Sequence, residues 1–401
     1  MDEVGKSCRC HATHSVPLRP ESTAFMAPST ATTRKHLLLV GGGHAHVLVL
    51  EAFARYPEPG LAITLVSKDR LTPYSGMLPG HMAGIYTRDE IHIDLERLAR
   101  RASARLVLDE AVGFDRTARR VRLKRGEELA YDILSVDIGI TPDLSGIAGA
   151  EEHALAVKPI GSLLEKWDRL VDSAFAPNGP RRFAIVGGGA AGICLAFAVR
   201  AFFAARVSDP VEVSLIGAFE APGINAGMRR RVARALKRRR ITVHAEDAAV
   251  RIGQDGVTLA SGRRVPADVV LVSTHAAAAP VLAATDWSKD ESGFLAIAPT
   301  LQILNDEAVF AAGDCATMVA HPRPKAGVFA VRQGPVLARN LRRAVRGEAL
   351  ETYIPQRDHL LLIATGDGRA IGGRGRFLAF GGRLAWRLKD FIDRRFMRRF
   401  E

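Results

Sequence analysis

Two glycine-rich stretches carry the residues with the clearest chemical potential in this sequence. In Arg182 to Val199, "RFAIVGGGAAGICLAFAV", an apolar strand runs into glycines at the spacing G-x-G-x-x-G. Glycines at this spacing allow a tight turn, let the backbone approach a diphosphate, and let the following helix pack closely on the strand. The N-terminus of that helix would offer free N–H groups and the positive end of the helix dipole to the phosphates. The stretch therefore predicts a dinucleotide site formed by Gly187, Gly188, Gly189 and Gly192.

A second stretch, Leu37 to Leu50 ("LLLVGGGHAHVLVL"), has the same strand–turn–helix pattern but departs from it at one position. Gly41 and Gly43 stand where the turn and the phosphate approach need glycine, while His46 takes the place of the last glycine. The imidazole of His44 or His46 could reach a phosphate or the edge of a cofactor, or both rings could serve packing alone. The sequence leaves this choice open, and it predicts a nucleotide site formed by Gly41, Gly42, Gly43 and His44.

The strand after each glycine unit ends without the acidic residue that often binds the adenosine ribose. Ser67 ends the first of these strands, and its hydroxyl can still form a hydrogen bond with a ribose. Gly217 ends the second strand, with Glu220 nearby, so the choice between NADH and NADPH stays open.

A third signal is "VFAAGDC", from Val309 to Cys315. A strand ends here in small residues, which let the backbone approach a bound cofactor. Asp314 follows directly and can accept a hydrogen bond from a sugar-like hydroxyl, although Gly-Asp alone is a common turn. The segment therefore adds Gly313 and Asp314 to the candidate cofactor residues.

The elements around these motifs define the fold class. Each glycine turn lies between an apolar strand and a helical stretch, and a further strand follows at Leu61 to Ser67 and at Val211 to Gly217. Two such units in one chain predict an α/β fold with parallel sheets. We also expect a helix from Gly327 to Ala344, then a hairpin or meander and an amphipathic C-terminal helix.

Length, charge and cysteine content narrow the function classes. The chain has 401 residues and a formal charge of +13, much of it in arginine runs such as that from Arg229 to Arg240. Such a run is usually a solvated helix face, and the alternative is that it binds an anionic membrane surface. Binding of nucleic acid is disfavoured because no aromatic platform or nucleic-acid motif accompanies the run.

Four cysteines without paired spacing indicate a reduced, cytoplasmic compartment and no metal site. No apolar run reaches the roughly 20 residues of a membrane span.

Taken in order, the three motifs resemble those of the FAD-dependent pyridine-nucleotide oxidoreductases, flavoproteins with two dinucleotide-binding domains. The resemblance implies two Rossmann-like three-layer (ββα) domains, the FAD domain being interrupted by the NAD(P)H domain. It implies that the first glycine motif and the Gly313-Asp314 segment bind FAD, and that the second motif binds NADH or NADPH. The expected divisions are a disordered leader (1–35), the FAD domain (36–157 and 273–345), the NAD(P)H domain (158–272) and a C-terminal hairpin and amphipathic helix (346–401).

A closer likeness is to the branch that holds type II NADH dehydrogenases and sulfide:quinone oxidoreductases. Closest is the NADH-dehydrogenase-like module found fused to selenophosphate synthetase, on the stretches "GGGHAHV", "TPYSGMLPG", "VKPI", "RPKAGVFAVRQGP" and "WRLKDFIDRRFMRRF". The chain would be a free-standing version of that module. This likeness implies that Tyr74, Ser75 and Gly76 approach the edge of the flavin ring, and that Lys158 and Lys325 are cations beside it.

The chain departs from its nearest families in its redox residues. It has no C-x4-C pair, so electrons should not pass through a disulfide, and Cys194 and Cys315 are not spaced as in the sulfide-oxidising enzymes. The two glutamines that face the quinone in type II dehydrogenases are Val328 and Arg332 here.

These features together predict an FAD-dependent NAD(P)H dehydrogenase that passes electrons from the flavin to a quinone or another small acceptor. The alternatives are a sulfide- or selenide-oxidising flavoprotein, or a flavoprotein partner in selenium metabolism that does not use NAD(P)H. The basic C-terminal helix, with Trp386 and Phe391, suits the inner face of a cytoplasmic membrane. It could instead pack on its own protein or on a homodimer partner.

Overall fold

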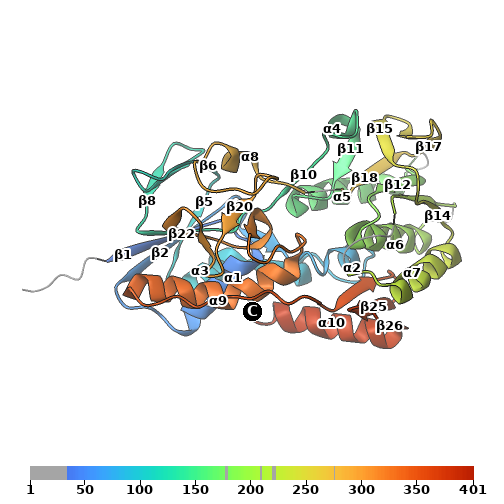
Figure 1. Cartoon of the computed structure of the whole chain (residues 1–401). Coiled ribbons are helices and arrows are strands. Elements are labelled where there is room, and N and C mark those ends of the chain that lie inside the picture. The colour runs from blue at the N-terminus through green and yellow to red at the C-terminus, as the bar shows by residue number, and fades with distance from the viewer. Residues whose placement is uncertain (1–33, 177–178, 208–209, 219–222, 275) are drawn as a thin grey trace, which may run out of the picture. The chain divides into compact units, whose positions relative to one another are not determined.

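The computed structural model describes residues 34–176, 179–207, 210–218, 223–274 and 276–401. The expected leader lies outside these ranges except for its last two residues, and so does Glu220. Within them the chain is an α/β structure built on two sheets, one parallel throughout and one with a parallel centre, which confirms the predicted fold class (Figure 1).

The first sheet has eight strands in the order β23-β20-β21-β22-β9-β1-β2-β5. Its centre is parallel: β1 pairs with β2 on one side and with β9 on the other, and β9 pairs with β22. Leu37, Leu38 and Leu39 of β1 are fully buried, as expected for a strand covered on both faces. Its strands are β1 (Lys35–Val40), β2 (Leu61–Ser67), β5 (Arg105–Leu108), β9 (Ile133–Val136), β20 (Leu295–Ile297), β21 (Gln302–Ile303), β22 (Asp306–Ala311) and β23 (Ala316–Met318).

Two layers cover this sheet (Figure 1). On one side lie α1 (His44–Arg55), α3 (Leu95–Arg101) and α9 (Gly327–Arg346), and on the other a small antiparallel sheet of β6 (Ala111–Asp115), β7 (Arg120–Leu123) and β8 (Glu128–Ala130). Helix α9 begins at the predicted residue. It packs closely against α1 because Gly334 leaves no side chain there: a Cβ at Gly334 would lie 2.7 Å from the side chain of Leu48.

The second sheet has five parallel strands in the order β11-β18-β12-β13-β14. Three helices pack around it, and a three-stranded antiparallel sheet, β15–β17, follows β14 in the chain. The bounds are β11 (Ala154–Ala156), α5 (Ile160–Ala174), β12 (Arg182–Val186), α6 (Ala190–Ala204), β13 (Glu212–Ile216), α7 (Ala226–Arg238), β14 (Ile241–His244), β15 (Ala249–Gly253), β16 (Gly256–Leu259), β17 (Arg264–Pro266) and β18 (Val269–Val272).

The chain leaves the first sheet and returns to it through two adjacent crossings. The outgoing segment β10 (Thr141–Pro142) pairs antiparallel with the returning segment β19 (Ala276–Ala277). The second sheet is therefore inserted between two parts of the first. The residue limits of the predicted domains stay predictions.

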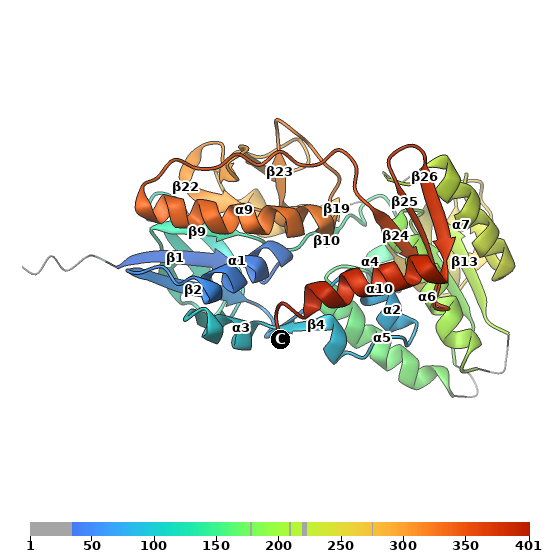
Figure 2. The same cartoon turned by 90° about the horizontal axis from the view of Figure 1, so that it is seen from below.

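The C-terminal region is a three-stranded antiparallel sheet followed by a helix (Figure 2). Its elements are β24 (Leu361–Ala364), β25 (Ala370–Arg374), β26 (Leu378–Gly382) and α10 (Arg383–Met397). Of the two expected forms, hairpin or meander, the structure has the meander. The remaining short elements are β3 (Leu71–Pro73), α2 (Leu78–Met82), η1 (Asp89–Ile91), β4 (His92–Asp94), α4 (Ala150–His153), α8 (Pro280–Ala283) and η2 (Gly313–Cys315).

Candidate functional site

The first glycine turn lies at the carboxyl end of β1, where the chain turns into α1. Gly41 has a φ of +103°, and a Cβ at this position would lie 2.3 Å from the carbonyl oxygen of Asp137. A Cβ at Gly42 would meet Leu95 at 2.6 Å and the hydroxyl of Ser67 at 3.0 Å. The predicted residues Gly41, Gly42 and Ser67 therefore come together in a turn that only glycine can form at Gly41.

His46 has a structural role in this turn. Its ring is fully buried, with Nδ1 2.7 Å from the carbonyl oxygen of Gly41 and Nε2 2.8 Å from the hydroxyl of Ser135. Burial lowers the pKa of His46 to about 4, so the ring is neutral and can donate one of these bonds and accept the other. His46 thus ties the helix to the turn and to β9 where glycine would only permit close packing.

Asp137 lies at the N-terminus of α1, and sequence reasoning did not give it a role. Its Oδ2 accepts hydrogen bonds from the backbone N–H groups of Ala45 (2.8 Å) and His46 (3.0 Å). Burial raises the pKa of this carboxyl from 3.8 to about 7. The available signal was its place directly after a buried strand next to β1, which is the same argument that selected Asp314.

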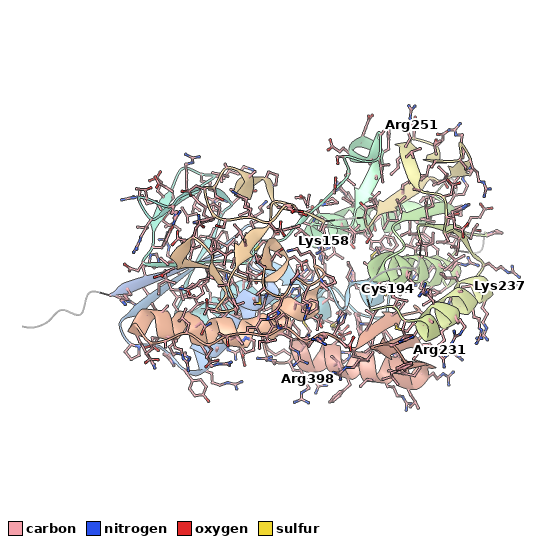
Figure 3. All side chains as sticks on the ribbon, viewed as in Figure 1. Lys158, Cys194, Arg231, Lys237, Arg251 and Arg398 are labelled. Carbon is pink, nitrogen blue, oxygen red and sulfur yellow. The ribbon has the colours of Figure 1, made fainter. Side chains whose placement is uncertain are left out.

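The Gly313-Asp314 segment approaches the same turn from β22. A Cβ at Gly313, whose φ is +71°, would lie 2.3 Å from Oδ1 of Asp137. The N–H of Gly313 donates to Oε1 of Gln333 at 2.7 Å, and Asp314 accepts an ion-paired hydrogen bond from Lys158 at 2.5 Å. Lys158 lies between β11 of the second sheet and α5 (Figure 3). The structure thus brings Asp137 and Lys158 next to the Gly313-Asp314 segment, which lies at least 155 residues later in the sequence.

His44 is the clearest sign that this arrangement holds a further group. Its Nε2 is enclosed and has no hydrogen-bond partner among the described residues. Burial lowers the pKa of His44 to about 4, so the ring is neutral and one nitrogen can accept or donate a bond. A buried polar atom without a partner costs free energy, and a bound ligand would remove that cost. The tight glycine cradle and this nitrogen together fit a nucleotide cofactor.

The predicted flavin-edge segment, Tyr74 to Gly76, adjoins His44. The rings of Tyr74 and His44 are 5.5 Å apart, and a Cβ at Gly76 would lie 2.7 Å from the Tyr74 ring. Ser75 faces the start of α9, since a Cβ at Gly327 would lie 3.3 Å from its hydroxyl.

Helix α10 supports this segment through a buried ion pair that the sequence did not reveal. Lys389 pairs with Asp393 one helical turn away and also donates to the carbonyl oxygen of Gly76 at 2.7 Å. Asp393 lies 3.4 Å from the Tyr74 hydroxyl, and burial raises the pKa of both groups. A Lys and an Asp four residues apart on a partly apolar helix face were the available signal.

Lys325 lies on the other side of the Gly313-Asp314 segment. Its ammonium donates to the carbonyl oxygen of Ala316 and to the hydroxyl of Thr317, both at 2.7 Å, and lies 3.8 Å from the centre of the Phe294 ring. Burial lowers its pKa. Lys325 lines a cavity of about 30 Å³ together with Gly313 and Asp314, so both lysines adjoin that segment.

The second glycine turn lies at the carboxyl end of β12 and opens α6. Gly187 has a φ of +127°, and a Cβ there would lie 2.3 Å from the carbonyl oxygen of Ser273. A Cβ at Gly188 would lie 2.1 Å from the carbonyl oxygen of Ala218, and one at Gly192 only 1.9 Å from that of Gly187. Gly189 is the residue before α6 and, because it has no side chain, it does not cap the helix. All four predicted glycines therefore form one turn with its helix N-terminus available to an anion.

The described cysteines are buried thiols. Burial raises the pKa of Cys194 to about 11 and that of Cys315 to about 12, so both are protonated at neutral pH. Within the described ranges, no group of three or more His, Cys, Asp or Glu side chains could hold a metal ion.

Comparison with known proteins gives one family that matches most of the chain and several related dehydrogenases. The model of the family described as "Pyridine nucleotide-disulphide oxidoreductase" matches residues 35–334. A probable NADH dehydrogenase of Dictyostelium discoideum is 26% identical over 232 residues, which cover 53% of this chain and 51% of that protein. A type II NADH:quinone oxidoreductase of Staphylococcus epidermidis is 27% identical over 147 residues, 36% of each chain. The chain thus spans about half the length of these relatives or less.

Two solved structures share the fold. The sulfide:quinone oxidoreductase of Aquifex aeolicus superimposes with a TM-score of 0.75 at 20% identity, covering 91% of both chains. NDH2 of Plasmodium falciparum, in complex with NADH, gives a TM-score of 0.74 at 13% identity, covering 90% of this chain and 97% of that one.

Proposed function

The chain belongs to the pyridine nucleotide-disulphide oxidoreductase family, and we propose that it is a dehydrogenase that oxidises NADH or NADPH with FAD as its cofactor. When bound, FAD supplies the chemistry: it accepts a hydride from the nicotinamide and releases electrons to a second substrate. The observation that carries this proposal is the presence of two glycine turns, each at the carboxyl end of a parallel strand and at a helix N-terminus.

We assign the first turn to FAD. Gly41, Gly42 and Gly43 would lie against its diphosphate, and the unpartnered Nε2 of His44 would bond to the bound cofactor. Asp314 would accept a hydrogen bond from a hydroxyl of the cofactor, with Lys158 holding the carboxylate in place at 2.5 Å. Lys158 and Lys325 would also place positive charge near the flavin, which favours electron uptake.

We assign the second turn to the nicotinamide nucleotide. Gly187, Gly188 and Gly192 pack against carbonyl oxygens of the protein itself, which holds the turn tight against the strand. The N–H groups at the start of α6, which this turn opens, would bind the diphosphate. Gly217 has a φ of +130° and presents no side chain at the end of β13, which leaves the preference between NADH and NADPH to solution measurements.

The electron acceptor proposed here is a quinone, as in the name of the Staphylococcus epidermidis relative. Sulfide or selenide oxidation is a weaker candidate, since Cys194 and Cys315 are buried thiols with raised pKa values rather than accessible thiolates. Cys8 and Cys10 lie outside the described residues.

An anaerobic titration tests the dehydrogenase proposal. FAD-loaded protein is mixed with NADH or NADPH, and the visible absorbance of the oxidised flavin is followed. We expect one or both nucleotides to bleach it, and a quinone analogue to restore it. A flavin that stays oxidised with both nucleotides would overturn the proposal and favour the flavoprotein that does not use NAD(P)H.

We further propose that α10 contacts the inner face of the cytoplasmic membrane. Its outer side exposes Leu384 (77% exposed) and Phe391 (56%), and Phe377 before β26 is 86% exposed. Arginines flank these side chains, as in helices that lie at a bilayer surface. No helix in the described part of the chain has the length and apolar content to cross a bilayer.

Vesicle sedimentation checks this contact. We expect the variant Leu384→Glu/Phe391→Glu to lose most binding to vesicles that contain phosphatidylglycerol, because two charges would enter the apolar contact. The matched variant Leu304→Glu/Val319→Glu changes two exposed apolar residues elsewhere and should bind normally. Equal binding by wild type and both variants would exclude α10 as the contact.

A further inference from the structure

A basic cavity lies among the C-terminal half of α6, helix α7 and the C-terminal sheet. Its volume is about 810 Å³, within the usual range for small-molecule sites. Seven of its sixteen lining residues are arginine, and Asp367 is the one carboxylate among them. Figure 3 shows Arg231 on α7, on the side toward the C-terminal sheet.

Two of these arginines have structural partners. Arg200 donates to the carbonyl oxygens of Arg239 (2.9 Å) and Val211 (3.0 Å). Arg239 pairs with Asp367 at 2.5 Å and lies over the ring of Phe197. These contacts hold the end of α6 and of α7 together, as cations near helix C-termini commonly do. The only carboxylate of the cavity is therefore already neutralised.

The other arginines of the cavity are exposed and have no carboxylate partner among the residues that the structure describes. Arg231, Arg234 and Arg238 lie on one face of α7, at the spacing i, i+3, i+7, and Arg369 approaches from the C-terminal sheet. Like charges gathered on one wall repel one another unless an anion lies between them. Guanidinium groups bind phosphate through paired N–H donors, which makes phosphate the anion that fits best.

The cavity is distinct from the nucleotide turn on the same helix. The glycine turn precedes the first residue of α6, Ala190, whereas Arg200, Ala201 and Ala204 line the cavity near its end. A helix of this length measures roughly 20 Å, so the two positions lie at opposite ends of it. Nothing in the proposed hydride transfer uses these arginines.

We propose that this cavity binds a ligand carrying phosphate groups with at least two negative charges, held by Arg231, Arg234, Arg238 and Arg369. A soluble diphosphate compound and the two-phosphate headgroup of cardiolipin share this chemistry. The site is independent of the proposed dehydrogenase activity.

Calorimetry of the FAD-loaded protein with inorganic diphosphate tests the proposal. We expect binding that the variant Arg231→Gln/Arg234→Gln/Arg238→Gln weakens roughly tenfold or more, because three charged donors are lost. The control variant Arg100→Gln/Arg125→Gln/Arg263→Gln removes the same charge from exposed positions outside the cavity and should bind as wild type does. Diphosphate can also bind at a glycine turn. Binding at the cavity is therefore measured as the difference in diphosphate affinity between the cavity variant and the control variant.

A second arm identifies the source of the phosphate. If the native ligand is a lipid, sedimentation with vesicles that contain cardiolipin, but not with phosphatidylcholine vesicles, will depend on the cavity arginines and not on the control arginines. The proposal is overturned if the protein binds no diphosphate and its vesicle binding does not depend on the cavity arginines. It is also overturned if the cavity variant and the control variant lose binding equally. Flavin reduction by NADH should be unchanged in the cavity variant, so failure of this site is distinguishable from failure of the proposed function.

Discussion

The two glycine turns both join a buried strand to a helix, but they differ in the residue at the last position of the motif. Both follow a buried parallel strand and open a helix, and both begin with a glycine of positive φ, Gly41 and Gly187. In the second turn the last glycine, Gly192, packs directly on the backbone, with 1.9 Å between its would-be Cβ and the carbonyl oxygen of Gly187. In the first turn His46 stands at that place and bonds to Gly41 and Ser135. The last glycine of the motif is therefore replaceable when a buried polar ring supplies the contacts.

The turns also differ in what lies at the helix N-terminus. Asp137 accepts two N–H bonds at the start of α1, whereas among the residues that the structure describes no side chain accepts a bond from the first N–H groups of α6. The first turn is thus braced by the protein's own carboxyl, and the second keeps its donors for a ligand.

The largest effect is expected from Gly192→Ala. Its Cβ would overlap the carbonyl oxygen of Gly187, so the turn must open and the helix must shift. We expect kcat/KM for NADH or NADPH to fall by roughly a hundredfold or more, as when a positioning contact is displaced by about 1 Å. The visible flavin spectrum should remain, since the first turn is untouched. Loss of bound FAD in this variant would contradict the separation of the two sites.

The reciprocal change, His46→Gly, restores the usual glycine to the first turn. It removes two buried hydrogen bonds and a buried ring, and it leaves the hydroxyl of Ser135 without that partner. We expect the free energy of unfolding to fall by about 2–4 kcal/mol. Urea denaturation measures this change. An unchanged or increased stability would show that His46 merely fills space.

A smaller and pH-dependent effect is expected from Asp137→Asn. The pKa of Asp137 is raised from 3.8 to about 7 in the folded protein, so the folded state binds more protons than the unfolded state between these values. Its contribution to stability is therefore present at low pH and is lost as the pH rises from about 4 to about 7. His44 and His46, with pKa values lowered to about 4, act in the opposite sense between pH 4 and 6.5.

The test is the difference in unfolding free energy between wild type and Asp137→Asn as a function of pH. We expect this difference to fall steadily from about pH 4 to about pH 7, because the histidine contributions cancel in it. A difference that stays constant from about pH 4 to about pH 7 would contradict this, because it would mean that the carboxyl is ionised over the whole range in the folded protein.

Local patterns were enough to predict much of the fold. The apolar strands β1 and β12, both glycine turns and the start of α9 at Gly327 follow from residue types over short windows. The insertion of the second sheet and the place of Asp314 near the first turn followed from the family resemblance. The pairing of Lys158 with Asp314 depends on segments 156 residues apart, and no short pattern contains it.

Other residues carried only a weak local signal and were not given their roles, because those roles depend on packing between distant elements. The role of Asp137 requires β9 to lie beside β1, so that its carboxyl reaches the start of α1. The support that Lys389 gives to Gly76 requires α10 to return to the first half of the chain. The arginine run in α7 gave the expectation of a solvated face, with an anionic membrane surface as the alternative. It did not reveal a cavity, because the sheet that completes the cavity comes more than a hundred residues later.

A crystal structure of the protein with FAD and NAD⁺ would show directly which turn holds which nucleotide. We expect the FAD diphosphate to lie over Gly41 to Gly43, with a cofactor atom bonded to Nε2 of His44, and the NAD⁺ diphosphate to lie over Gly187 to Gly189. FAD bound at the second turn, or a first turn that holds no nucleotide while His44 stays unpartnered, would contradict this assignment.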